Sequence, residues 1–212
     1  MNSWAGFVLA WSWRLVQHQG SRDARSRRAV RSRAAAGEAL AVGRTTADPA
    51  GHALRAYNER MATRIYTDTS VIGGCEDEEF RVHSRRLMTS FARGEARLVV
   101  SELTLREVEQ APIAVRDVLA GIPEAHIEIV RLTPEAEELA ARYVAEGILT
   151  ANMLADAQHI AMATIARVDV LVSWNFRHVV NLPRIQRYHS VNARHGYVAL
   201  EIRSPREVLA DE

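Results

Sequence analysis

Short apolar runs alternate with amphipathic segments along residues 61–212. Each run is rich in aliphatic residues and bounded by polar ones, which is typical of a buried β-strand. Because helix-length segments separate the runs, the alternation predicts an α/β fold with a mainly parallel central sheet flanked by helices. The predicted strands cover residues 64–67, 98–100, 126–131 and 168–173.

Helical spacing and N-cap residues mark the segments between these strands. In residues 77–93, the apolar residues Phe80, Leu87 and Phe91 share one helical face. Thr133 is followed at once by a proline, a combination that favours the first turn of a helix. The predicted helices cover residues 77–93, 102–110, 112–121, 133–147 and 152–166, with Ser101 as an N-cap and a last capping box opening at Ser204.

The first 60 residues lack this pattern. Residues 17–60 are rich in Arg, Ala, Ser and Gly and contain few aliphatic residues, so they cannot bury enough surface to offset the loss of chain entropy. We expect translation to start at Met61 and the folded domain to cover 61–212, so that the Arg/Ala-rich residues 1–60 are an upstream reading extension or a disordered tail. A functional basic arm that touches RNA is the alternative.

The formal net charge of +1 hides an asymmetry between these two parts. Residues 1–60 carry ten arginines and four acids, whereas residues 61–212 carry 17 arginines and 22 acids. No residue is a lysine, which excludes P-loop and Schiff-base chemistry, since both need one. The single cysteine, Cys75, excludes an internal disulfide, and no apolar run approaches the length of a membrane span. We therefore expect a cytoplasmic protein that has no membrane partner.

Three acids and one asparagine lie next to the predicted strands. Asp68 follows the first strand, and Glu107 lies in the helix after the second. Asp156 lies in the helix before the fourth strand, and Asn175 follows that strand. Ligands of open parallel sheets bind beyond the carboxyl ends of the strands, so we expect these side chains to converge there. Crowded carboxylates repel one another unless a cation neutralises them, and hard oxygen ligands select Mg²⁺ or Mn²⁺.

Each of these residues also has a structural interpretation. Asp68 before Thr-Ser has the pattern of a turn or cap residue, Glu107 that of a solvated helix residue, and Asn175 that of a turn former. Asp156 has alanines on both sides, and a carboxylate on so apolar a helix is costly without a partner. His159 lies on the same helical face as Asp156, where we expect a packed or supporting residue rather than a metal ligand.

The ordered set of motifs resembles the PIN-domain family, and within it the VapC-type toxins of bacterial toxin–antitoxin pairs. The resemblance covers essentially all of residues 61–212. It rests on Asp68-Thr69-Ser70, on Glu107 six residues after Ser101, on LADAQHIA at 154–161, on VSWNFRH at 172–178, and on the stretch from Val191 to Pro205.

This resemblance implies a PIN-like three-layer sandwich and a Mg²⁺-dependent (or Mn²⁺-dependent) endoribonuclease. Asp68, Glu107 and Asp156 would hold the metal, and a metal-activated water would attack the phosphorus in line, leaving a 5′-phosphate and a 3′-hydroxyl. The resemblance also implies a small cognate antitoxin as partner and a homodimer.

One position departs from the family's common pattern. Asn175 stands where many members carry an aspartate, and its amide contributes no charge, so fewer charges are left for a second ion. This substitution supports the alternative of a catalytically weak or inactive PIN module that binds RNA or a protein. A housekeeping ribonuclease without an antitoxin is a third interpretation.

Contacts with RNA are expected from a few side chains, because the net charge of residues 61–212 is −5. Thr69 and Ser70 are candidates for hydrogen bonds to a phosphate or to a ligand carboxylate, and Arg177 and His178 for contact with RNA phosphate. Local arginines would add to binding, namely Arg81, Arg85, Arg177 and Arg184. The acidic run at residues 76–79 is expected to be a solvated helix start.

Overall fold

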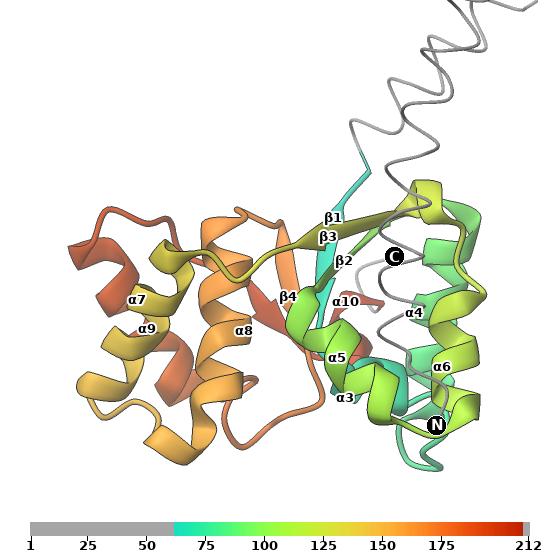
Figure 1. The fold of residues 1–212 in the computed structure, drawn as a ribbon, viewed down its shortest axis with the longest axis horizontal. Helices are drawn as coiled ribbons and strands as arrows, with labels where there is room; N and C mark the ends of the chain where they lie inside the picture. Colours follow the sequence, from blue (N-terminus) through green and yellow to red (C-terminus); the bar gives the residue numbers. More distant parts are fainter. Residues whose placement is uncertain (1–61, 210–212) are drawn as a thin grey trace, which may run out of the picture. The chain divides into compact units, whose positions relative to one another are not determined.

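A computed structural model describes residues 62–209, and within them five parallel strands form one sheet in the order β3-β2-β1-β4-β5 (Figure 1). Helices connect the strands, so the predicted α/β fold with a parallel sheet is confirmed. The predicted extension at residues 1–60 lies outside the described residues. The strands are β1 (Arg64–Thr67), β2 (Arg97–Ser101), β3 (Ile127–Val130), β4 (Val170–Val172) and β5 (Ile202–Arg203).

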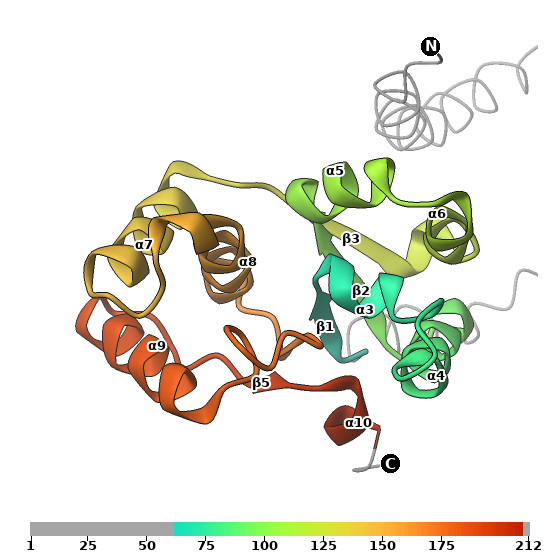
Figure 2. The ribbon, with the colours of Figure 1, turned by 90° about the horizontal axis from the view of Figure 1, so that it is seen from below.

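Helices cover both faces of the sheet, which gives three layers. Figures 1 and 2 show α7, α8 and α9 on one side of the sheet, and α4 and α6 on the other. No helix within residues 62–209 is long and apolar enough to cross a membrane. The α-helices are α3 (Thr69–Gly73), α4 (Arg81–Arg93), α5 (Glu102–Gln110), α6 (Ile113–Ala120), α7 (Pro134–Ala145), α8 (Leu154–Ile165), α9 (Leu182–Arg194) and α10 (Pro205–Val208), and two short 3₁₀ turns cover Glu124–His126 and Ala151–Met153.

Most helix starts lie where the N-cap residues predict them. Ser101 caps α5 by accepting a hydrogen bond from the backbone N–H of Thr104, and Thr133 caps α7 with a proline in its first turn. Ser204 and Glu207 form the predicted capping box of α10. Local side-chain chemistry therefore determines where these helices begin.

Two expectations from the sequence need correction, and the structure adds two elements. The helix predicted over residues 77–93 begins at Arg81, and the acidic run 76–79 forms an exposed turn before it rather than its first turn. The strand predicted over residues 168–173 is confined to β4. Helix α9 and strand β5 were not predicted, because α9 is rich in polar residues and β5 is only two residues long.

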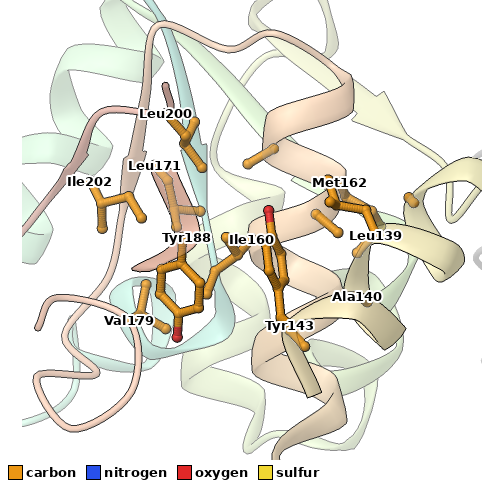
Figure 3. Close-up of a cluster of buried hydrophobic side chains, with 14 of the residues drawn as sticks. Leu139, Ala140, Tyr143, Ile160, Met162, Leu171, Val179, Tyr188, Leu200 and Ile202 are labelled. Carbon is orange, nitrogen blue, oxygen red and sulfur yellow. The ribbon is translucent and has the colours of Figure 1, made fainter. Parts of the chain in front are cut away.

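The largest group of buried side chains lies between the sheet and helices α7, α8 and α9. Figure 3 shows Tyr143 of α7 beside Tyr188 of α9, with ring centroids 5.1 Å apart in a T-shaped arrangement. Leu139 and Ile160 pack into the same cluster. The hydroxyl of Tyr143 donates a hydrogen bond of 2.6 Å to Oδ1 of Asn192, so both buried polar atoms are paired.

The strand order fixes where a ligand site is expected. The chain moves outward from β1 through β2 to β3 and then crosses back, so β4 pairs with the free side of β1. The carboxyl ends of β1 and β4 therefore form a topological switch point, which is where ligands bind in open α/β sheets. Figure 2 views the molecule from the side on which β1 continues into α3.

Candidate active site

Asp68 lies at the carboxyl end of the central strand, as the sequence predicts. Its side chain caps α3: Oδ1 accepts hydrogen bonds from the backbone N–H of Ser70 at 3.1 Å and from the Ser70 hydroxyl at 2.5 Å. Oδ2 accepts a 2.6 Å hydrogen bond from the hydroxyl of Ser173. Only 7% of the residue is exposed. Burial raises the pKa of Asp68 above its usual value, although the nearby His159 and the serine hydroxyls act in the opposite direction.

Glu107 lies on α5, where Ser101 sets the start of the helix at the end of β2. The hydroxyl of Thr69 donates a short hydrogen bond to Oε2 of Glu107, and Nε2 of His159 lies 3.5 Å from the same oxygen. Burial by itself raises the pKa of Glu107, but His159 and Thr69 outweigh burial, and the pKa lies below its usual value. Glu107 is thus held in its ionised form beside α3, the helix that Asp68 caps.

His159 of α8 lies between Glu107 and the central strand β1. It is buried, and its Nδ1 lies 2.7 Å from the hydroxyl of Tyr66 on β1. Tyr66 is also buried, and burial raises the pKa of its hydroxyl, which therefore stays protonated. A protonated hydroxyl can donate to Nδ1, which leaves the proton on Nε2, the nitrogen facing Glu107. His159 thus occupies the supporting place that its position on α8 predicts.

Asp156, in the first turn of α8, forms a second group with the segment after β4. Oδ1 of Asp156 accepts a 3.1 Å hydrogen bond from Nδ2 of Asn175, and Oδ2 lies 2.8 Å from Nδ1 of His178. The amide oxygen of Asn175 accepts a hydrogen bond from the backbone N–H of His178. Asn175 therefore presents its amide donor, not its oxygen, to Asp156.

Ser173 joins the two groups. Its hydroxyl donates to Asp68 and accepts a 2.9 Å hydrogen bond from the backbone N–H of Asn175, whose side chain holds Asp156. On the other side, Glu107 and Asp156 are linked through α8, because His159 lies three residues beyond Asp156. Hydrogen bonds thus join Asp68 to Asp156, and Glu107 is held by Thr69, the residue after Asp68, and by His159. We call this group, at the carboxyl ends of the strands, the acid edge (Asp68, Glu107, Asp156 and their partners Thr69, Ser70, His159, Ser173, Asn175 and His178).

The acid edge is not a closed three-carboxylate cluster. Within residues 62–209, no group of three His, Cys, Asp or Glu side chains lies close enough together to hold one metal ion in this arrangement. The donor chemistry nevertheless fits a hard cation, because Asp68 is a buried carboxylate that accepts hydrogen bonds from neutral hydroxyl and backbone N–H groups.

The candidate RNA contacts divide into inward-facing and exposed residues. Thr69 and Ser70 both bond to carboxylates of the acid edge, which is one of the two roles expected of them. The side chain of His178 is 14% exposed and bonds to Asp156, whereas Arg177 is exposed to solvent.

The other expected arginines differ in what they contact. Arg85 pairs with Glu76 at 2.9 Å and donates to the carbonyl of Cys75. Arg184 donates a short hydrogen bond to the carbonyl of Ile148, and Arg81 lies near the carbonyl of Glu76. The side chains of these arginines therefore already bind groups of the protein and are only partly available for RNA.

Sequence reasoning missed Ser173 and Tyr66 as members of the site. Ser173 stands directly after β4, the position equivalent to that of Asp68 after β1, so strand-end placement was an available signal. Tyr66 looked like an ordinary strand residue, and only the packing of α8 against β1 reveals its contact with His159.

No protein-family model matches the chain, and no curated protein matches it in sequence. Solved structures with a similar arrangement include VapBC2 from Rickettsia felis bound to a DNA fragment from their promoter, at 12% identity and a TM-score of 0.45, covering 67% of this chain and 98% of that one. VapC20 from Mycobacterium tuberculosis, a Sarcin-Ricin loop cleaving toxin, is 15% identical with a TM-score of 0.43, covering 54% of this chain and 92% of that one. A toxin-antitoxin complex from Klebsiella pneumoniae is 18% identical with a TM-score of 0.42, covering 57% of this chain and 93% of that one.

These structures include VapC and VapBC proteins, the group that the sequence resembles. At such identities and TM-scores, the likeness says nothing about shared chemistry. The function must therefore be inferred from the side chains of this chain.

Proposed function

We propose that residues 61–212 form a Mg²⁺-dependent endoribonuclease that hydrolyses RNA phosphodiesters. The observation that carries this proposal is the acid edge: a buried Asp68 at the switch point of the sheet is joined through hydrogen bonds to Asp156, and Glu107 is held by Thr69, the residue after Asp68, and by His159. Asp68 is a poor choice for stability alone, because burial disfavours its charged form. Perturbed carboxylates at a ligand-binding edge favour a catalytic role.

The chain's own residues divide the work of such a site. Asp68, Glu107 and Asp156 would hold the cation, which when bound lowers the pKa of a water and polarises the phosphate. Thr69 fixes the rotamer of Glu107, and His159 keeps that carboxylate ionised. Asn175 and His178 hold both oxygens of Asp156. These partners limit the freedom of the ligands, as residues around metal ligands do in general.

The proposal extends to partners on the strength of the sequence motifs. RNA is the substrate, a small antitoxin encoded beside the protein is the inhibitor, and two copies form a homodimer in the cytoplasm. Co-expression with any small reading frame that lies beside the gene, followed by purification and size-exclusion chromatography, tests the antitoxin and the dimer together. A monomer that elutes without any bound small protein would contradict both.

The activity itself is tested with structured RNA in the presence and absence of Mg²⁺. Wild-type protein is expected to cut the RNA with Mg²⁺ and to leave it intact with a chelator, and mapped ends should carry a 5′-phosphate. Asp68→Asn should lower the rate by at least about a hundredfold, since it removes a charge at the centre of the site. Val198→Ala, an exposed change before β5 at the opposite edge of the sheet, is the matched control.

A second candidate function is a PIN-like module that binds RNA without cutting it. The observation that favours it is the orientation of Asn175, whose oxygen accepts a backbone hydrogen bond instead of facing the acids. Tight RNA binding by wild-type protein, with no cleavage of any tested RNA at any Mg²⁺ or Mn²⁺ concentration, would favour this function over the nuclease.

A further inference from the structure

In the four-residue segment 175–178 after β4, the first and last side chains face the protein and the middle two face solvent. Asn175 and His178 point inward and bind Asp156, as described above. Phe176 and Arg177, the two residues between them, are exposed. The same four consecutive residues therefore hold an acid of the site and place an aromatic ring and a guanidinium on the surface beside it.

Hydrogen bonds hold the backbone of this segment in place. The backbone N–H groups of Val179 and Val180 both donate to the carbonyl of Asn175 at 2.9 Å. The N–H of Phe176 donates to the carbonyl of Trp174, and Nδ2 of Asn181 lies 3.4 Å from the carbonyl of Phe176. The exposed side chains thus stand on a structured turn, which lowers the entropy cost of binding a ligand there.

A layer of aromatic rings supports Phe176 from the protein side. Trp174 is buried, and its Nε1 donates a 2.8 Å hydrogen bond to the hydroxyl of Ser84. Phe80 stacks on Trp174 with centroids 4.5 Å apart, and the ring of Phe176 lies 6.0 Å from Trp174 in a tilted arrangement. Phe176 is nevertheless 49% exposed, so part of a large apolar ring faces solvent.

An aromatic face beside an arginine has the chemistry of a nucleotide subsite. Every base has a π-face that can stack on an aromatic ring, and such stacking does not depend on the base's identity. Arg177 supplies the positive charge that a phosphate needs, in a domain whose residues 61–212 carry a net charge of −5. Bases in a duplex are already stacked, so the ring can receive only an unpaired base.

We propose that Phe176 is a stacking platform for an unpaired base of single-stranded or looped RNA, with Arg177 contacting an adjoining phosphate. The inference rests on the proposed nuclease function and narrows its substrate class to RNA with an exposed base near the cut phosphodiester. Phe176 would act by binding the substrate and would leave the carboxylates unchanged.

Binding measurements test the platform separately from cleavage. The full chain carrying Asp68→Asn, which suppresses cutting, is titrated into a labelled single-stranded RNA and into its blunt duplex. A 2-aminopurine in the single strand reports stacking through its fluorescence. Phe176→Leu is compared with Phe176→Tyr, which keeps an aromatic face, and with Val198→Ala, which removes exposed apolar surface elsewhere.

The expected result is that Phe176→Leu weakens single-strand binding by at least about fivefold and abolishes the fluorescence change. Phe176→Tyr and Val198→Ala should keep both, and the duplex affinity should be the same for all variants. An equal affinity of Phe176→Leu and its parent for the single strand would overturn the platform. An equal loss of affinity for the duplex would also overturn it, as would a chain that binds no RNA. The same holds if Phe176→Leu impairs only the binding of a protein partner.

The two proposals fail in different ways. A wild-type chain that cuts no RNA but shows the stacking signal would refute the nuclease and leave the base platform standing. A wild-type chain that cuts RNA with no contribution from Phe176 would refute the platform alone.

Discussion

The hydrophobic cluster around Tyr143 and the acid edge differ in the kind of polar group that they bury. In the cluster, the buried Tyr143 hydroxyl bonds to a buried neutral amide, and apolar side chains fill the surroundings. At the acid edge, a buried carboxylate, Asp68, accepts hydrogen bonds from serine hydroxyls and is joined through Ser173 and Asn175 to a second acid, Asp156. The first arrangement lowers the free energy of the folded state, whereas the second buries a carboxylate, whose charged form burial disfavours, at a cost to stability. Such a cost is typical of functional sites.

The largest stability effect is expected in the hydrophobic cluster. Leu139 is 1% exposed, so Leu139→Ala removes buried methyl groups and leaves a cavity, which should lower the free energy of unfolding by about 2–5 kcal/mol. Urea denaturation measures this change. RNA cleavage per folded molecule should stay at the wild-type level, and a loss of cleavage by fully folded protein would show that the two regions are coupled.

A smaller effect of opposite sign is expected at the acid edge. Asp68→Asn removes a buried charge and keeps the shape of the side chain, so it should raise the free energy of unfolding by about 1 kcal/mol, or a few degrees in Tm, while cleavage is lost. Thermal unfolding with a chelator present measures it, because a bound cation would add its own attraction to the carboxylate.

The pH dependence of this difference has a defined sign. The folded-state pKa of Asp68 is raised, so the charged form is disfavoured in the folded protein. The wild type should lose stability as the pH rises from the usual aspartate range through the raised pKa. The advantage of Asp68→Asn should therefore be largest at neutral pH and vanish in acid. A variant less stable than the wild type at neutral pH would contradict this account.

The smallest effect is expected at Glu107, whose side chain is 35% exposed. Its folded-state pKa is lowered despite burial, because His159 and Thr69 favour the charged form. The charged Glu107 therefore stabilises the protein above its unfolded-state pKa, and this contribution is lost as the pH falls through the lowered pKa. Glu107→Gln should reduce the free energy of unfolding at neutral pH by less than about 1 kcal/mol, given solvent screening.

Thermal unfolding across the acid range checks this third prediction. The difference between Glu107→Gln and the wild type should disappear at low pH, where the wild-type carboxyl is protonated as well. A gain in stability, as predicted for Asp68→Asn, would contradict this account. It would mean that the charged form of Glu107, like that of Asp68, destabilises the folded protein.

Much of the fold could be predicted because its signals are local. The apolar runs at β1 and β2, the cap at Ser101 and the Thr133-Pro134 pair act over a few residues, and each gave a boundary close to the observed one. Helix α9 was missed since its buried Tyr188, Val191 and Asn192 are spread among polar residues. Strand β5 was missed because pairing with β4, and not its own composition, makes it a strand.

The sequence suggested candidate acids for the site but not their contacts. The position of Asp68 after the first strand, with the other acids near strand ends, was enough to place all three at one edge of a parallel sheet. Which partner each acid binds depends on side chains from distant segments. Ser173 lies 105 residues from Asp68 along the chain, and Tyr66 lies 93 residues from His159.

The sequence alone determined the class of fold and the starts of most helices, because periodicity and capping operate between neighbours in the chain. Tertiary structure alone decided that β4 returns to pair with β1, that Asn175 turns its amide donor to Asp156, and that Phe176 faces solvent. These outcomes depend on which remote surfaces pack together, and no local pattern encodes the free energy of that packing.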